Sequence, residues 1–225
     1  MRNNYLRRAD SFGFSLIELM MTMLIVVILA GIAIPYFAGE LHTSQMRGAV
    51  SDFASLTESQ RLYAIRDNRF YSTYILAASG SNPPQAYVDM FPKSSTGASG
   101  NGGTAVVEGT PGVTGDPVIE IPGEVTQQAQ GNAPSTTNLQ NQLLPANTTV
   151  APIDASVTPI TFSPRGLPCA PFAVTGGTVC DSAGGPAAYW TFFENSSSHE
   201  WDALTITPAG RIQKWYYTGS QWNTF

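Results

Sequence analysis

The first forty residues of the chain combine a basic, polar start with a long run of apolar positions. Residues 1–13 carry three arginines against a single acid, and from Leu19 to Gly39 there are twenty-one consecutive residues without a charge. About 20 apolar residues in an α-helix are enough to cross a bilayer. By the positive-inside rule the arginines hold the N-terminus in the cytoplasm. The pattern predicts a single-pass membrane protein with most of its chain outside the cytoplasm.

After this run the pattern changes to that of an amphipathic helix. Apolar residues recur at steps of three and four, while charged residues lie mostly off their stripe. The stripe comprises Met46, Ala49, Val50, Phe53, Leu56 and Tyr63. We expect one continuous helix from about Ser15 to about Arg66, with a membrane part at 14–39 and an amphipathic part at 40–66. Pro35 removes a backbone donor and is expected to kink or loosen it.

Residues 67–225 have the pattern of a β-rich head. Asp67-Asn68 suits the end of the helix, and Phe70, Tyr71, Tyr74 and Ile75 suit the beginning of the head. Further strands are predicted at 157–162, 188–193, 203–207 and 211–217, the last two joined by a hairpin turn at 208–210. The residues expected to face the helix are Phe192, Leu204, Ile206, Ile212 and Trp215. The fold class is therefore α+β, a long N-terminal helix packed on a C-terminal antiparallel sheet.

The segment from about 79 to 158 is rich in Gly, Pro, Ser, Thr, Asn and Gln. This composition is typical of a flexible linker, an exposed insertion or a glycosylated surface, and it does not decide among them. We favour an exposed insertion in the head, with short strands at 105–107 and 118–121.

Composition narrows the classes of function. Charged residues make up 12% of the chain, and the formal net charge is −5, which argues against a globally basic nucleic-acid coat protein. The two histidines, His42 and His199, lack metal-ligand spacing, and the chain has neither a complete phosphate-binding loop nor a GxSxG motif. We therefore expect no enzymatic activity, no cofactor and no metal.

Cys169 and Cys180 are the only cysteines, and they enclose ten residues. The simplest use of the pair is one disulfide in an oxidising compartment. Closing a loop of that size contributes about 2–3 kcal/mol in the chain-entropy model. The alternative, a reactive thiol, lacks a nearby basic group in the sequence.

Glu18 places a carboxylate inside the start of the apolar run. An acid in hydrocarbon is costly, so it is a candidate functional residue. A cleavable secretory signal peptide is the alternative, with small residues at Ala30, Gly31 and Ala33 that suit cleavage. Glu18 itself, and the continuation of the helical pattern past those residues, favour an uncleaved segment.

The run Gly13-Phe14-Ser15-Leu16-Ile17-Glu18-Leu19 resembles the processing motif of type IV pilins and type II secretion pseudopilins. The resemblance implies that a prepilin peptidase cuts between Gly13 and Phe14 and methylates the new Phe14 amine. Residues 1–13 would then be a cytoplasmic leader. It also implies a bacterial inner-membrane subunit with a periplasmic head, which later joins a filament or pseudopilus. Its partners would be other pilin or pseudopilin subunits, the inner-membrane assembly platform and membrane lipid.

The charges of the motif suggest how subunits assemble. The Phe14 amine is a cation at the edge of an apolar helix, and Glu18 is an anion one turn away. Burying either charge alone is strongly unfavourable, so pairing Glu18 of one subunit with the Phe14 amine of another would fix the register of packing. Phe14, Glu18 and Pro35, at the twenty-second mature position, are the candidate assembly residues.

A second resemblance covers residues 157–217. The segments Phe162 to Pro168 and Ile206 to Ile212 are similar to paired strand-turn signatures of H-type pseudopilins and FimT/FimU minor pilins. It implies a low-abundance subunit at the tip or in priming. The alternative is a DNA-binding minor pilin for DNA uptake, with Arg211 and Lys214 as candidate DNA-binding residues, although Gln213 stands where the basic element of such pilins has an arginine. A monomeric membrane-anchored protein is the remaining alternative.

Overall fold

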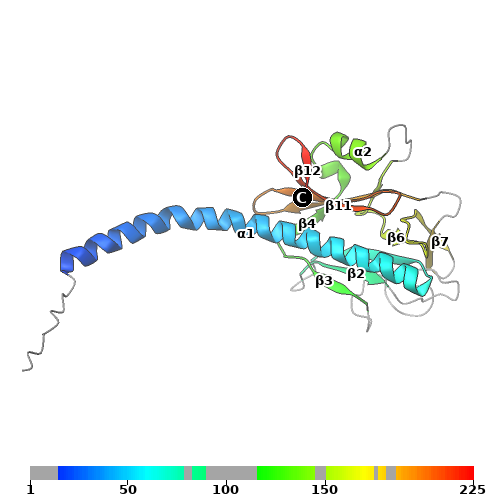
Figure 1. The fold of residues 1–225 in the computed structure, drawn as a ribbon, viewed down its shortest axis with the longest axis horizontal. Helices are drawn as coiled ribbons and strands as arrows, with labels where there is room; N and C mark the ends of the chain where they lie inside the picture. Colours follow the sequence, from blue (N-terminus) through cyan, green and yellow to red (C-terminus); the bar gives the residue numbers. More distant parts are fainter. Residues whose placement is uncertain (1–14, 79–82, 90–115, 145–150, 175–176, 181–185) are drawn as a thin grey trace, which may run out of the picture. The chain divides into compact units, whose positions relative to one another are not determined.

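The computed structural model describes residues 15–78, 83–89, 116–144, 151–174, 177–180 and 186–225. The chain divides into two units, residues 1–41 and 42–225, and helix α1 (Leu16–Asp67) runs through both (Figure 1). The expected long helix is confirmed, and its bounds differ from the prediction by one residue at each end. It is continuous through Pro35, so the proline does not end it.

The first unit holds the apolar part of α1. Its large hydrophobic side chains, from Leu16 to Leu41, are between 54% and 77% exposed. No second element of the described chain covers this part of the helix. Its apolar surface therefore has to be covered by something other than the described residues, because exposed apolar surface of this extent is unfavourable in water.

The C-terminal end of α1 is closed by a Schellman motif. Asn68 takes a positive φ of 52°, its N–H donates to the carbonyl of Ile65, and the N–H of Arg69 donates to the carbonyl of Ala64. Asparagine tolerates the left-handed conformation that this cap requires. The Asp67-Asn68 pair thus ends the helix as the sequence indicates.

Two antiparallel arrangements of strands build the head. The small sheet has the order β3-β2-β1-β6, formed by β1 (Tyr71–Leu76), β2 (Gln85–Asp89), β3 (Val118–Glu120) and β6 (Ile160–Phe162). The large sheet has the order β12-β11-β10-β9-β4, formed by β4 (Val125–Gln128), β9 (Tyr189–Asn195), β10 (Trp201–Ile206), β11 (Ile212–Tyr217) and β12 (Trp222–Thr224). β5 (Ile153–Asp154) adds to β9 in parallel.

The head part of α1 packs on both sheets through one buried face. Met46, Val50 and Phe53 share a core with residues of the small sheet, such as Val88 and Phe162, and of the large sheet, such as Leu204 and Ile206. The buried face then continues through Thr57, Gln60 and Ala64, whereas Tyr63 is only half-buried. The stripe predicted from the sequence is confirmed up to Leu56, and polar residues extend it.

Two consecutive side chains of α1 attach the helix to the head by hydrogen bonds. Gln60 is fully buried; its amide donates to the carbonyls of Tyr71 and Ile160 and accepts from the Thr73 hydroxyl. Arg61 donates from Nε to the Gly166 carbonyl at 3.0 Å and from Nη1 to the Gly210 carbonyl at 3.2 Å. Gln60 thus satisfies buried groups of the small sheet, and Arg61 holds two turns of the head.

The second face of the large sheet has its own cover. Helix α2 (Thr137–Leu143) buries Leu139 and Leu143 against Trp190, Phe192, Trp215 and Trp222. Figure 1 shows α2 on the side of β11 away from α1. Residues 116–144 are therefore an integral part of the head: β4 is the edge strand of the large sheet, and the short helix η1 (Gln130–Asn132) precedes α2. The exposed insertion expected for 79–158 is wrong for this part.

The presence of α2 also corrects which residues of the large sheet face α1. Leu204, Ile206 and Ile212 belong to the core shared with α1, as expected, whereas Phe192 and Trp215 belong to the core under α2. The reason is strand alternation: Ala203 pairs with both Phe192 and Trp215, so these side chains lie on the opposite face from Leu204. The predicted strand at 118–121 is confirmed as β3; that at 105–107 lies outside the described residues.

The segment between the cysteines forms a separate hairpin of β7 (Pro171–Val174) and β8 (Gly177–Cys180). The register places Cys180 opposite Pro171, two residues along the chain from Cys169. Cys169 is buried, and its carbonyl accepts a hydrogen bond from the Tyr189 hydroxyl at 2.7 Å. This backbone arrangement suits the Cys169–Cys180 disulfide, which remains a prediction.

Candidate functional site

Glu18 lies in the first turn of α1, on exposed helix surface. Its backbone N–H donates to the Ser15 hydroxyl at 3.2 Å, and Ser15 and Glu18 have the spacing of a capping box. A carboxylate in this position also suits the positive end of the helix dipole. Gly13 and Phe14 lie outside the described residues. Glu18, the acid of the motif, therefore lies at the N-terminal end of α1.

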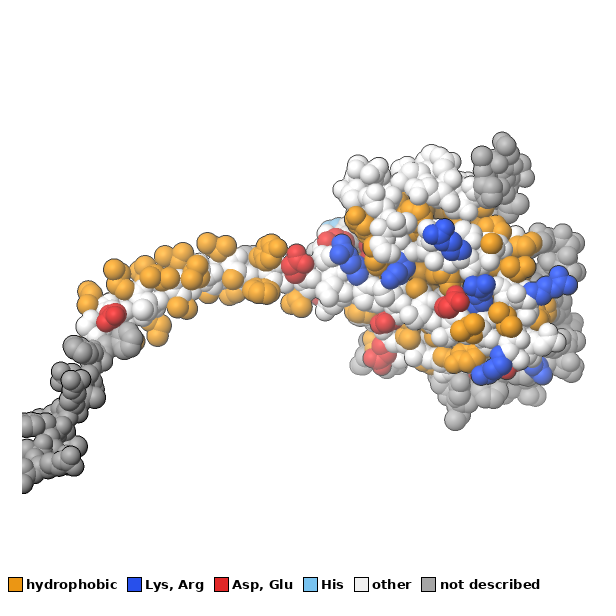
Figure 2. Space-filling model, in the orientation of Figure 1, with side chains coloured by type: hydrophobic (Ala, Val, Ile, Leu, Met, Phe, Trp, Pro, Cys, Tyr) orange, Lys and Arg blue, Asp and Glu red, His pale blue; other side chains and the backbone are white. Residues whose placement is uncertain are grey.

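The apolar part of α1 is an exposed surface that no other described residue covers. Figure 2 shows hydrophobic side chains along it on the face in view, with an acidic group near each end. α1 is long and apolar enough to cross a membrane, judged by length and composition. In hydrocarbon an α-helix satisfies its own backbone groups, so this segment meets the requirements of a membrane span.

The two candidate DNA-binding residues line the same open hollow on the head. Lys214 lies in β11 and faces α1: its Nζ donates to the Ser51 hydroxyl at 3.1 Å and lies 4.9 Å from the centre of the Phe225 ring. Arg211 is exposed and immediately precedes β11. The role of the two residues in DNA binding remains a prediction.

Arg211 follows a turn that touches a second turn with an arginine. The turns that contain Gly166 and Gly210 touch, because a side-chain carbon at Gly210 would lie 3.1 Å from the Gly166 carbonyl oxygen. Arg165 precedes the first glycine, Arg211 follows the second, and Arg61 bonds to both turns. Three arginines thus belong to or bond to the two touching turns. Figure 2 shows Lys and Arg side chains spread over the face of the head in view.

Two aromatic residues near Arg211 and Lys214 in the sequence, Trp215 and Trp222, are each 1% exposed and pack under α2. Trp215 donates from Nε1 to the Thr205 hydroxyl at 2.8 Å. These rings fill the core of the head and are not available to a ligand.

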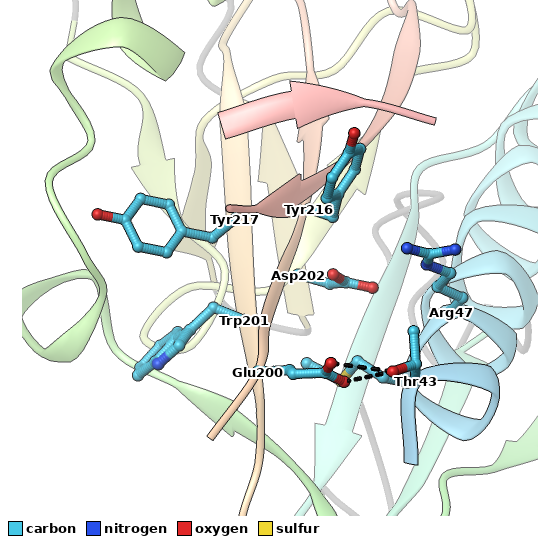
Figure 3. A pocket seen from close by; sticks show the side chains of 8 residues that line it. Thr43, Arg47, Glu200, Trp201, Asp202, Tyr216 and Tyr217 are labelled. Atoms are coloured by element: carbon cyan, nitrogen blue, oxygen red, sulfur yellow. Dashed lines mark hydrogen bonds between the residues drawn. The ribbon is translucent and has the colours of Figure 1, made fainter. Parts of the chain in front are cut away.

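A small polar cavity of about 50 Å³ lies between α1 and the large sheet (Figure 3). Asp202 of β10 is 4% exposed, lines this cavity, and its Oδ2 has no hydrogen-bond partner among the described residues. Glu200 also lines it, and both of its carboxylate oxygens accept from the Thr43 hydroxyl, at 2.9 and 3.1 Å. Burial raises the pKa of Asp202 to about 7, with Arg47 acting to lower it and Glu200 to raise it.

This cavity was not predicted from the sequence, although the alternation of residues around Asp202 indicates it. In the segment 202–206 every second residue, Asp202, Leu204 and Ile206, falls on the same side of a strand. A carboxylate on the apolar side of an alternating strand indicates a buried charge, and the helix residues that face it are far away in sequence.

Comparison with known proteins gives a match at the N-terminus. The family described as the prokaryotic N-terminal methylation motif matches residues 8–34, which include Gly13, Phe14 and Glu18. This part of the chain is therefore similar to the N-termini of the pilin and pseudopilin superfamily. The architecture of the chain, a long N-terminal helix followed by antiparallel sheets, is that of a type IV pilin-like protein.

Two curated proteins resemble this pilin-like chain. Type II secretion system core protein G of Pectobacterium carotovorum subsp. carotovorum is 34% identical over 61 residues, and that of Klebsiella michiganensis is 29% identical over 85 residues. The matches cover 27% and 36% of this chain and 39% and 60% of the two relatives. No solved structure matches significantly. The resemblance of residues 157–217 to H-type pseudopilins therefore remains a prediction.

Proposed function

We propose that the protein is a subunit of a type IV pilus or of a type II secretion pseudopilus. The proposal rests on the apolar half of α1, which is exposed and long enough to cross a membrane. Glu18 lies in the first turn of this helix, within the residues that match the methylation motif. The names of the two relatives, core protein G of type II secretion, support the pseudopilin alternative.

The proposed life cycle follows from this helix. The chain inserts in the bacterial inner membrane with residues 1–13 in the cytoplasm and the head in the periplasm. A prepilin peptidase cuts between Gly13 and Phe14 and methylates the Phe14 amine. The assembly platform then moves the subunit from lipid into a bundle with other subunits, where neighbouring helices cover the apolar surface. Glu18 pairs with the Phe14 amine of a neighbour and sets the register.

Substitution of Glu18 tests the assembly step. Glu18→Ala should leave membrane insertion and cleavage intact and reduce incorporation into filaments at least about tenfold, since roughly 1.4 kcal/mol of lost pairing already gives that factor. Glu40→Ala is the matched control, an exposed acid on the same helix after the apolar run. Incorporation is measured by immunoblotting of sheared filaments. Equal incorporation of Glu18→Ala and Glu40→Ala would contradict the register role.

Processing is tested separately by mass spectrometry of the N-terminus. The native chain should begin with a methylated Phe14, and Gly13→Val should retain residues 1–13. A native chain that begins at Met1, or near position 33, would contradict the proposed maturation. The tip or priming position is proposed from the resemblance of residues 157–217, and it predicts sub-stoichiometric amounts in purified filaments.

DNA binding is a second candidate function, and one observation favours it: the cluster of Arg61, Arg165 and Arg211 at the two touching turns. In this form of the DNA-binding hypothesis, the second DNA-binding residue beside Arg211 is Arg165 and not Lys214. Duplex DNA affinity should fall in Arg165→Gln/Arg211→Gln, with a shallower salt dependence, and should change little in Lys214→Gln. Equal binding by the native chain and the double variant would remove this function.

A further inference from the structure

The cavity beside Asp202 is lined by more acidic than basic side chains. Two carboxylates line it, those of Asp202 and Glu200, and the only cationic side chain that lines it is Arg47. When both acids are ionised, one guanidinium leaves a local deficit of one positive charge. A buried carboxylate without a partner is strongly unfavourable, so a second cation would be bound there favourably.

Arg47 is engaged with other groups. Its guanidinium carbon lies 5.5 Å from the centre of the Tyr216 ring and 6.0 Å from that of the Phe225 ring, distances typical of cation–π contacts. Figure 3 shows Asp202 pointing towards α1 and Arg47 rising from the helix beside it, and no ion pair joins the two in the described chain. The Asp202 Oδ2 atom is therefore buried and has no hydrogen-bond partner among the described residues.

The walls of the cavity restrict the kind of cation. The described residues contain no group of three or more His, Cys, Asp or Glu side chains that could hold a metal ion. A volume of about 50 Å³ exceeds the roughly 10–15 Å³ that a cavity needs to hold one water molecule, and it suits a compact group. A primary ammonium has three N–H donors, enough for Asp202 and Glu200 together, and the Tyr216 ring adds an apolar, π-rich wall.

We propose that this cavity binds a primary ammonium group, the tip of a lysine side chain from a neighbouring subunit. The ammonium donates to Asp202 Oδ2 and to Glu200, while Thr43 continues to hold Glu200 from the other side. The neighbouring subunit rests on the function proposed above, whereas the ammonium site depends only on residues of the head. Thr43 and Arg47 follow the apolar segment of α1 within a few residues along the chain.

The site is tested first without any partner, using methylammonium chloride as the probe. The mature full-length chain in detergent micelles is titrated at about pH 8, where Asp202 is largely ionised, and thermal unfolding is followed. Methylammonium should raise Tm saturably. Tetramethylammonium chloride, which has the same charge but no N–H donor and a larger volume, should give at least a tenfold weaker effect.

Three variants make this test specific. Asp202→Asn should weaken methylammonium binding at least tenfold, and Glu200→Gln should weaken it as well. Asp52→Asn, the same chemical change on the exposed side of α1, should bind as the native chain does. Unchanged binding by Asp202→Asn, or equal effects of the two ammonium ions, would overturn the site. Binding by Arg47→Gln but not by the native chain would overturn it too, because Arg47 itself would then fill the cavity.

The occupant is tested by assembly. Asp202→Asn should be incorporated into filaments less than Asp52→Asn. If Asp202→Asn loses methylammonium binding yet is incorporated as the native chain is, a lysine of a neighbour is not the occupant and the proposal fails. Failure of the function proposed above would show differently, as normal incorporation of Glu18→Ala, whatever the ammonium titration gives.

Discussion

Asp202 is the residue whose ionisation is most affected by the fold. Its neighbours on β10, Leu204 and Ile206, face the core under α1, and the same alternation carries the carboxyl group out of water. Desolvation favours the neutral form and raises the pKa of Asp202 from its ordinary value of 3.8 to about 7. Without a bound cation, this group makes stability depend on pH.

The sign follows from linkage. The unfolded chain releases the Asp202 proton near pH 4 and the folded chain near pH 7. The contribution of the neutral Asp202 carboxyl to the free energy of unfolding is therefore fully present below about pH 4. It is lost as pH rises through 7, by on the order of 4 kcal/mol. Asp202→Asn should lose less stability between about pH 4 and pH 8 than the native chain, as measured by guanidinium unfolding. If the stability of Asp202→Asn changed with pH in parallel with that of Asp52→Asn, this would contradict a buried, unpaired carboxyl at Asp202.

Gln60 illustrates a polar residue used as a core residue. Its amide satisfies two backbone carbonyls of the small sheet, so an apolar substitute leaves them buried without donors. Gln60→Leu should destabilise the head by about 3 kcal/mol in the same unfolding assay. Gln45→Leu, on the exposed side of the same helix, should stay within about 0.5 kcal/mol. Similar losses in both variants would show that the cost arises from leucine on the helix in general.

At the scale of elements, the two glycine turns are fixed by contacts with each other and with α1. Gly166 and Gly210 have φ values of 70° and 81°, and each would place a side-chain carbon against neighbouring atoms. Gly219 also has a positive φ, 88°, but its surroundings are open. The three positions therefore separate backbone strain from crowding.

Alanine substitutions measure this difference. Gly219→Ala should cost only the strain of a left-handed residue, about 1–2 kcal/mol. Gly210→Ala adds a contact of 3.1 Å with the Gly166 carbonyl and displaces Arg61, so it should cost about 1–2 kcal/mol more. The comparison uses chemical unfolding followed by tryptophan fluorescence. Equal costs at the two positions would mean that the turns do not press on each other.

Elements with local signals were predictable, and those that depend on distant packing were not. The 52-residue helix, its end at Asp67 and the hairpin at 208–210 follow from periodicity, a left-handed cap and turn residues within a few positions. α2 escaped prediction because Leu139 and Leu143 stand in an amide-rich segment of only seven helical residues. Its helix is stabilised by burial against tryptophans more than forty residues away, which no local pattern reports.

The candidate site divides in the same way. The motif around Glu18 was readable because its chemistry lies within seven consecutive residues. That Arg165 and Arg211 flank two touching turns was not, since it depends on contact between turns about forty residues apart. The hydrogen bond of Lys214 to Ser51 of α1 was not readable either, because the two residues are far apart in the sequence.

At the scale of the whole molecule, an exposed apolar helix segment is followed in the chain by the head. In the head, α1 covers one face of the large sheet and α2 covers the other. The β7–β8 hairpin pairs with none of the other described strands, so cross-linking its two ends would limit its motion most. We predict a Cys169–Cys180 disulfide. Alkylation of the unfolded native chain should add no mass before reduction and two labels after it.

Loss of the disulfide should be visible in stability. Cys169→Ala/Cys180→Ala should lower the free energy of unfolding by about 2–3 kcal/mol under the chain-entropy model. The native chain under reducing conditions is the matched control and should show a similar loss. Two labels before reduction would show that the thiols are free.

The double attachment of Arg61 constrains how this head can diversify. One guanidinium bonds to carbonyls in two turns that come from separate parts of the chain. A library that randomises residues 163–166 alone would therefore select sequences that still fit 207–210 and the arginine between them. Grafting new binding loops onto this scaffold should succeed more often when both turns and position 61 are exchanged as one set.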